Sequence, residues 1–171
     1  VFAELQTGAV AHTFAYSHFD IDRRDPGGFT TRFEGERKRL SYLGSAELTG
    51  NATLTFGLDK TEESFNSGGA TGEEDTVSAQ AELLLRPNDQ IDVSFALRHD
   101  DNSDFGGKTT GRLAGVWRPQ EDLAFRAVLG TGFRAPSLYE RFSIYGDPTL
   151  QPEESRSFEL GVEKTYGETA S

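Results

Sequence analysis

Apolar and polar residues alternate along most of this chain, and almost no segment repeats with the 3.6-residue period of a helix. Val77, Ala79, Leu83 and Leu85, for example, share one face of a strand predicted over residues 76–86. The pattern predicts an all-β fold, an antiparallel up-and-down meander of about nine long strands. The predicted strands are residues 1–5, 9–22, 38–48, 52–60, 76–86, 90–100, 108–118, 123–134 and 155–166.

The connections between these strands alternate in length. Consecutive antiparallel hairpins would place every short turn at one end of the sheet and every long loop at the other. Short turns, rich in Gly, Pro, Asn and Asp, are centred on residues 7–8, 50–51, 87–89 and 119–121. Long polar loops are predicted at residues 23–37, 61–75, 101–107 and 135–154.

Strand length and loop asymmetry bear on whether the sheet is soluble or spans a membrane. Strands of soluble proteins average about 5–6 residues, whereas a tilted strand needs about 9–11 to cross a bilayer. Short turns on one side and long loops on the other are typical of outer-membrane barrels. The pattern therefore favours a segment of a transmembrane β-barrel. The alternative is a soluble β-sandwich that binds carbohydrate or protein through its long loops.

Composition excludes several functions. The 171 residues include 17 Lys and Arg against 28 Asp and Glu, a net charge of −11, which opposes nucleic-acid binding. The absence of cysteine excludes disulfides, thiolate metal sites and cysteine nucleophiles. No catalytic constellation stands out, so we expect neither an enzyme nor a cofactor. Methionine is also absent, so we expect the chain to be a piece of a longer protein.

Two linked motifs lie near the C-terminal end, GFRAPSL at residues 132–138 and GDPTLQPE at residues 146–153. They resemble the barrel signature of TonB-dependent outer-membrane receptors, particularly the branch of cobalamin and catecholate siderophore receptors. The resemblance implies that residues 1–171 are a partial β-barrel domain, with the plug domain and the remaining strands absent. It implies uptake of a ferric siderophore, heme or cobalamin across the outer membrane of a Gram-negative bacterium. TonB, the plug and outer-membrane lipid would be the partners.

An excised barrel segment would have two unpaired edge strands and an apolar face without lipid. We therefore expect it to dimerise through its edges, to curl into a smaller closed sheet or to pack as a sandwich.

The loop of residues 135–154 is where we expect contact with ligand or plug. Arg134 and Arg141 can form bidentate contacts with carboxylate or phosphate, and Tyr139 and Tyr145 offer flat aromatic faces with a hydroxyl. Such side chains suit anionic, aromatic siderophores. The alternative is that the two arginines only neutralise carboxylates inside the barrel, namely Glu140, Glu153 and Glu159.

Two acidic clusters could supply oxygen ligands to calcium, and calcium ordering of the outer loops is implied by resemblance to the cobalamin receptor. Neither has the Gly that an EF-hand loop needs at its sixth position, so solvated loops are the alternative. His12 and His18 lie six residues apart on one strand face, about 20 Å, and cannot share an ion. The clusters are Asp20, Asp22 and Asp25, and Asp100, Asp101 and Asp104.

Overall fold

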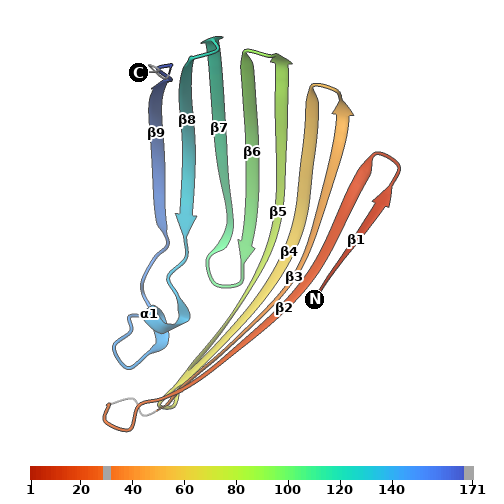
Figure 1. Ribbon diagram of the computed structural model, residues 1–171. Coiled ribbons are helices and arrows are strands. Elements are labelled where there is room, and N and C mark those ends of the chain that lie inside the picture. The colour runs from red at the N-terminus through yellow and green to blue at the C-terminus, as the bar shows by residue number, and fades with distance from the viewer. Residues whose placement is uncertain (29–31, 168–171) are drawn as a thin grey trace.

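The computed structural model describes residues 1–28 and 32–167, which form one curved sheet with a short helix beside it (Figure 1). Within these ranges nine strands pair in sequence order, each antiparallel to the next. The predicted all-β, up-and-down meander is therefore confirmed. The strands are β1 (Phe2–Thr7), β2 (Val10–Arg24), β3 (Arg32–Thr49), β4 (Ala52–Ser67), β5 (Ala70–Asn88), β6 (Ile91–Asn102), β7 (Gly106–Gln120), β8 (Leu123–Arg134) and β9 (Glu153–Lys164).

Each connection lies at the end of the sheet where the sequence pattern predicted it. The turns that join β1 to β2, β3 to β4, β5 to β6 and β7 to β8 lie together at the top of Figure 1, which we call the turn end. The opposite end, which we call the loop end, carries the connection between β8 and β9 with the helix α1 (Leu138–Phe142). No helix in the described part of the chain is long and apolar enough to cross a membrane.

Three of the four predicted long loops, residues 23–37, 61–75 and 101–107, are shorter than expected, because residues 23–24, 32–37, 61–67, 70–75, 101–102 and 106–107 belong to strands. β4 continues to Ser67 and β5 begins at Ala70, so only Gly68 and Gly69 separate them. Both glycines have positive φ, 61° and 92°, as a tight two-residue hairpin requires. The polar composition of these stretches was taken to indicate loops. It is equally compatible with strands that carry charged side chains on both faces. We call residues 17–24, 32–39, 60–67 and 70–77 the arm.

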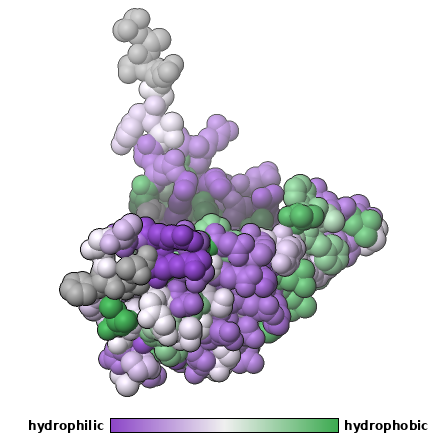
Figure 2. Space-filling view, turned by 90° about the horizontal axis from the view of Figure 1, so that it is seen from below, coloured by the Kyte–Doolittle hydropathy of each residue, from purple (hydrophilic) through white to green (hydrophobic). Residues whose placement is uncertain are grey.

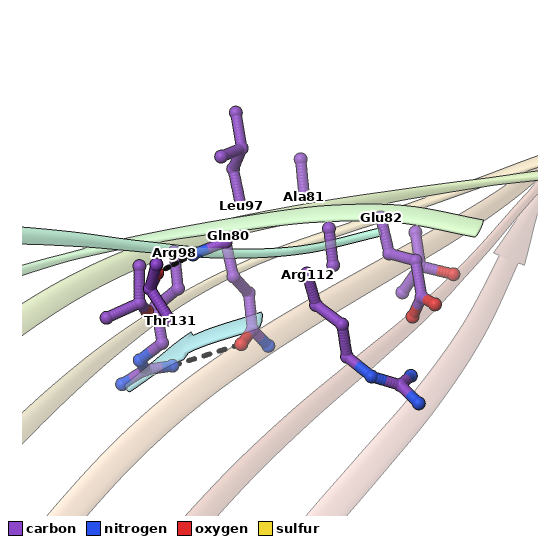
Figure 3. A pocket seen from close by; sticks show the side chains of 11 residues that line it. Gln80, Ala81, Glu82, Leu97, Arg98, Arg112 and Thr131 are labelled. Carbon is purple, nitrogen blue, oxygen red and sulfur yellow. Dashed lines mark hydrogen bonds between the residues drawn. The ribbon is translucent and has the colours of Figure 1, made fainter. Parts of the chain in front are cut away.

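The two faces of the sheet differ in character. Leu58, Leu113 and Leu160 lie on one face with 57%, 44% and 72% of their surface exposed, whereas Asp59 and Ser78 on the other are 6% and 3% exposed. Side chains crowd on the inner side of a curved sheet and spread apart on its outer side. The polar face is therefore concave and the apolar face convex. In Figure 3 the side chain of Leu97 points to one side of the sheet, and those of Gln80 and Arg98 point to the other.

The convex apolar surface ends where the arm begins. Beyond Leu40 and Leu58, the same face carries Lys38 and Lys60, and acidic side chains follow. Figure 2 looks onto the loop end and shows hydrophilic residues over most of the surface visible from that side. The apolar side chains of the convex face, which we call the apolar band, therefore stop short of the arm.

Over the residues that the structure describes, the sheet neither closes nor acquires a second layer. In the described ranges β1 pairs only with β2 and β9 only with β8. The expected smaller closed sheet and the expected sandwich packing are therefore wrong, and the soluble β-sandwich is not supported. An apolar face of this extent needs an apolar partner to cover it. Dimerisation through the edge strands stays a prediction.

Candidate functional site

The helix α1 begins with a capping box on the concave side of the loop end. The Ser137 hydroxyl accepts a hydrogen bond from the Glu140 backbone N–H at 3.3 Å, and the Glu140 carboxylate accepts one from the Ser137 backbone N–H at 2.7 Å. The same carboxylate accepts a hydrogen bond from Arg134 at 2.8 Å. The sequence prediction missed this helix, although serine followed three residues later by glutamate is the signal of such a cap.

The Glu140 carboxyl should remain ionised to an unusually low pH. The Ser137 backbone N–H, the Arg134 guanidinium and the Ser137 hydroxyl lower its pKa from the usual 4.5 to about 2. Because the folded-state pKa is depressed, this carboxylate stabilises the cap above about pH 4.5, and the contribution is lost as the pH falls through about 2. Titration of a ¹³C-labelled Glu140 carboxyl by NMR in micelles should give a midpoint near 2. The midpoint should rise in Ser137→Ala, and a wild-type midpoint near 4.5 would contradict the cap.

Aromatic side chains hold α1 against the arm. The ring of Tyr139 lies 6.2 Å from that of Phe33 and 6.0 Å from that of Phe65, measured between centroids, and Phe65 is buried. The ring of Phe142 lies over Gly72 of β5, where a Cβ would come within 2.5 Å of it. The strand therefore leaves room at Gly72 for an aromatic ring from a helix far away in the sequence.

Arg141 anchors the same helix through charge. Its side chain is 10% exposed and forms ion pairs with Asp104, in the turn between β6 and β7, and with Glu74 of β5 at 3.7 Å. Its guanidinium lies over the rings of Phe105 and Phe142, 4.7 and 4.5 Å from their centroids. Burial, together with the Asp104 and Glu63 carboxylates, raises the pKa of Glu74, which lies in the arm. Arg141 is thus the cation that offsets a crowded group of carboxylates.

A pocket of about 460 Å³ opens beside this helix at the loop end. Its walls combine aromatic and apolar side chains with one cation and one carboxylate, a composition suited to a ligand that is partly aromatic. Tyr139 and Tyr145 come from the loop of residues 135–154, and the other lining residues come from β2, the connection that follows β2, β3 and β4. The remaining lining residues are Ile21, Arg23, Asp25, Gly28, Phe33 and Ser67.

The structure divides the four predicted ligand-binding residues. Tyr139 and Tyr145 line the pocket and are 47% and 71% exposed. Arg134 is exposed and forms ion pairs with Glu140 at 2.8 Å and with Glu153 at 3.6 Å. Arg141 is enclosed by its carboxylates and aromatic rings. Arg134 therefore has two of the three acidic neighbours named in the alternative interpretation, whereas Arg141 is paired with Asp104 and Glu74, which that interpretation did not name.

The three aspartates predicted as calcium ligands do not come together. Asp100 lies on the concave face, where it accepts hydrogen bonds from Ser78 at 2.6 Å and Arg98 at 2.8 Å. Asp101 is the next residue of the same strand and therefore projects from the opposite face. Asp104 is paired with Arg141. This geometry carries no calcium site.

A charged network covers the middle of the concave face. Asp59 accepts hydrogen bonds from Arg39 at 2.8 Å and from Arg98 at 3.1 Å, so one buried carboxylate joins β3 to β6 across two intervening strands. Arg98 also donates to Gln80 at 3.0 Å, as the dashed line in Figure 3 shows. Arg126 pairs with Glu163 of β9 on this same face. The concave face is thus a polar wall.

The sequence prediction missed the contribution of β2 and β3 to the pocket. Phe14 and Tyr16 lie on the convex face, but Phe19 and Ile21 lie on the concave face of the same unbroken ladder. The apolar side chains thus change from one face to the other along a single strand. This change of face lies at the boundary between the apolar band and the arm. In the apolar band the apolar side chains lie on the convex face, whereas in the arm the pocket lies on the concave side.

Comparison with known proteins gives concordant results. Residues 3–171 match the family described as TonB dependent receptor-like, beta-barrel. The vitamin B12 transporter BtuB of Vibrio vulnificus (strain YJ016) is 30% identical over 139 residues, which cover 77% of this chain and 22% of that protein. BtuB of Photobacterium profundum is 29% identical over 141 residues, 80% of this chain and 23% of that protein. The chain thus spans about a fifth of the length of these two relatives.

Solved structures share the fold. The siderophore receptor PirA from Pseudomonas aeruginosa superposes with a TM-score of 0.86 and 21% identity, covering 96% of this chain and 34% of that one. A variant of the ferric enterobactin receptor PfeA from Pseudomonas aeruginosa, in complex with enterobactin, superposes with a TM-score of 0.73 and 17% identity, covering 96% and 32%. With a family match over nearly the whole chain and a sheet that superposes on receptor barrels, this chain belongs to the TonB dependent receptor-like β-barrel family.

Proposed function

We propose that this chain forms part of the barrel wall of a receptor that takes up a ferric siderophore, heme or cobalamin across the outer membrane of a Gram-negative bacterium. The observation that carries the proposal is the single curved sheet with an apolar convex face and a charged concave face. Lipid would cover the convex face, and a plug domain supplied by the rest of the receptor would meet the concave wall. The family comprises receptors and transporters, and we propose no enzymatic activity.

The orientation follows from the two ends of the sheet. In outer-membrane barrels short turns face the periplasm and longer connections face the outside. The turn end would therefore face the periplasm, where TonB acts, and the arm with α1 would extend into the medium. The stacked rings of Trp117 and Phe125, 5.5 Å apart near the turn end, suit the interface between lipid and water.

The pocket beside α1 would contact the incoming ligand. Tyr139 and Tyr145 present exposed aromatic faces to it, while Arg134 and Arg141 hold the loop through their carboxylate partners. Aromatic stacking suits catecholate iron chelators and the flat macrocycles of heme and cobalamin. The names of the related proteins, which refer to vitamin B12, siderophores and enterobactin, support this class of cargo.

Replacing Tyr145 by alanine should weaken ligand binding without affecting the barrel. Tyr145 is 71% exposed and lines the pocket, so little of the fold rests on it. An aromatic contact contributes about 0.5–1.5 kcal/mol, so we expect the Kd to rise about two- to tenfold. The measurement is quenching of intrinsic fluorescence in the intact receptor, titrated separately with ferric enterobactin, hemin and cyanocobalamin.

Tyr166→Ala is the matched control, because Tyr166 is 83% exposed and follows β9 at the turn end. Its Kd for whichever probe binds should equal that of the wild type. A Tyr145→Ala receptor that binds that probe as tightly as the wild type would remove the pocket from the proposed function.

A further inference from the structure

A second group of side chains with ligand chemistry lies on the convex face of the arm, away from the pocket. His18 Nε2 is 3.1 Å from Asp20 Oδ1 and 2.8 Å from Glu36 Oε1. Within residues 1–28 and 32–167 these three form the one group of histidine and acidic side chains whose possible ligand atoms all lie within 4.8 Å of one another. The group joins β2 to β3.

The backbone fixes these three side chains on one surface. Asp20 is paired directly with Glu36, and His18 lies two residues before Asp20 and therefore on the same face. The ladder between β2 and β3 runs without a register shift from Val10 to Arg24. Little rearrangement of the backbone would therefore be needed for one ion to contact all three.

The donor set is that of a transition-metal site. One imidazole nitrogen and two carboxylate oxygens are ligands that Zn²⁺ binds at about 2.0–2.2 Å. Neighbouring ligand atoms of a tetrahedral site then lie about 3.4 Å apart, so the observed 2.8 and 3.1 Å need to open by only a few tenths of an ångström. The side chains of His18 and Glu36 are 39% and 37% exposed, which leaves the fourth position open to water.

The surroundings favour a cation. Asp20 and Glu36 lie along a groove of about 660 Å³ on the arm, whose lining includes three further carboxylates, those of Asp22, Glu34 and Glu73. Arg32 pairs with Asp22 and Glu34, at 3.1 and 2.7 Å, and takes no part in the group. The Lys38 ammonium lies 2.7 Å from Glu36 Oε1, so it is the cation that a metal ion would replace on that oxygen.

We propose that His18, Asp20 and Glu36 form a surface site for a divalent transition-metal ion such as Zn²⁺, which would clip β2 to β3 in the arm. The site differs from the calcium cluster expected from Asp20, Asp22 and Asp25, because Asp22 is engaged by Arg32 and the imidazole replaces an oxygen ligand. Imidazole favours zinc and similar ions, whereas calcium takes oxygen ligands only. The proposal does not depend on which nutrient the receptor binds.

The test uses the intact receptor in detergent micelles. Zn²⁺ is titrated in competition with a chromophoric chelator, and Co²⁺ is titrated alone to follow the visible absorption of a coordinated ion. The ligand variants are His18→Gln and Glu36→Gln. The controls are His12→Gln, on the same face of β2 but hydrogen-bonded to Thr7 and Tyr42, and Glu34→Gln, on the same face of β3. A parallel titration with Ca²⁺ tests for a site made of oxygen ligands alone.

We expect His18→Gln and Glu36→Gln each to weaken Zn²⁺ binding at least tenfold and His12→Gln to bind as the wild type does. Glu34→Gln removes a neighbouring charge of the groove but no ligand atom, so it should weaken binding much less than either ligand variant. Because these side chains are partly exposed, all variants should fold, which circular dichroism and the melting transition check. Absence of Zn²⁺ binding in the wild type would overturn the proposal. So would Zn²⁺ binding that survives His18→Gln, or Ca²⁺ binding that Glu36→Gln removes and His18→Gln leaves intact.

Discussion

Replacing Arg141 by alanine is expected to release α1 from the sheet, because it would remove the one cation that contacts both Asp104 and Glu74 in the described part of the chain. Breaking a buried ion pair by removing one partner costs about 3–5 kcal/mol when both groups are buried. Asp104 keeps 28% of its side-chain surface exposed, so we expect a loss near the lower end of that range. Hydrogen exchange of the amides of residues 137–147 in the intact receptor measures this loss.

Two further variants separate charge from packing at this position. Arg141→Lys keeps a cation near Asp104 but loses the planar group that lies over Phe105 and Phe142, so it should retain part of the protection. Arg134→Ala removes an exposed arginine from the same loop and should have a smaller effect. A receptor with Arg141→Ala that loses ligand affinity but keeps wild-type protection of residues 137–147 would contradict this structural role and favour direct ligand contact.

Replacing Gly146 by alanine is expected to open the turn that follows α1 and to abolish the pocket. A Cβ at this position would lie 2.6 Å from the Arg141 carbonyl carbon and 2.9 Å from the Phe142 nitrogen. These are backbone atoms, so they cannot rotate away as the end of a flexible side chain could. The turn is closed by hydrogen bonds from Gly146 N–H to the Ser143 carbonyl and from Asp147 N–H to the Glu140 carbonyl. Overpacking of this kind costs about 1–3 kcal/mol.

The effect of Gly146→Ala should be confined to the loop end. Amides of residues 138–147 should exchange faster, and the Kd for the bound probe should rise at least as much as in Tyr145→Ala. The melting transition of the barrel should not change, because no strand is altered. Gly50→Ala is the matched control, since a Cβ at Gly50 meets nothing within 4 Å. Wild-type exchange in the Gly146→Ala loop would refute the close approach.

The two linked motifs near the C-terminal end have identifiable structural roles. The first motif ends β8 with Arg134, buries Pro136 and caps α1 through Ser137. The second motif starts with Gly146, which alone fits against the backbone of Arg141, and ends at Glu153, where β9 begins. The two motifs therefore specify a compact helical connection between two neighbouring strands. The sequence showed that this stretch was special, but it was interpreted as an extended loop.

Local pattern determined the architecture. The two-residue period along β5, β6 and β8 was enough to predict the strands, the order of the meander and the division into an apolar and a polar face. Each of these depends on neighbours in the sequence, because a side chain's face is set by its position within its own strand. The alternating lengths of the connections likewise predicted which ends of the strands lie together.

Tertiary structure decided what the side chains at the loop end can do. Arg141 meets Glu74 and Asp104 across 67 and 37 residues of sequence, and Glu36 meets His18 through the pairing of β2 with β3. Neither contact follows from spacing within one strand, since each depends on the register of a ladder or on a helix folding over the concave face. The strands of the arm could not be recognised in the sequence for a related reason. Along the arm, charged side chains such as Glu36 and Arg37 lie on both faces of a strand, so the alternation that identified the other strands disappears although the backbone pairing continues.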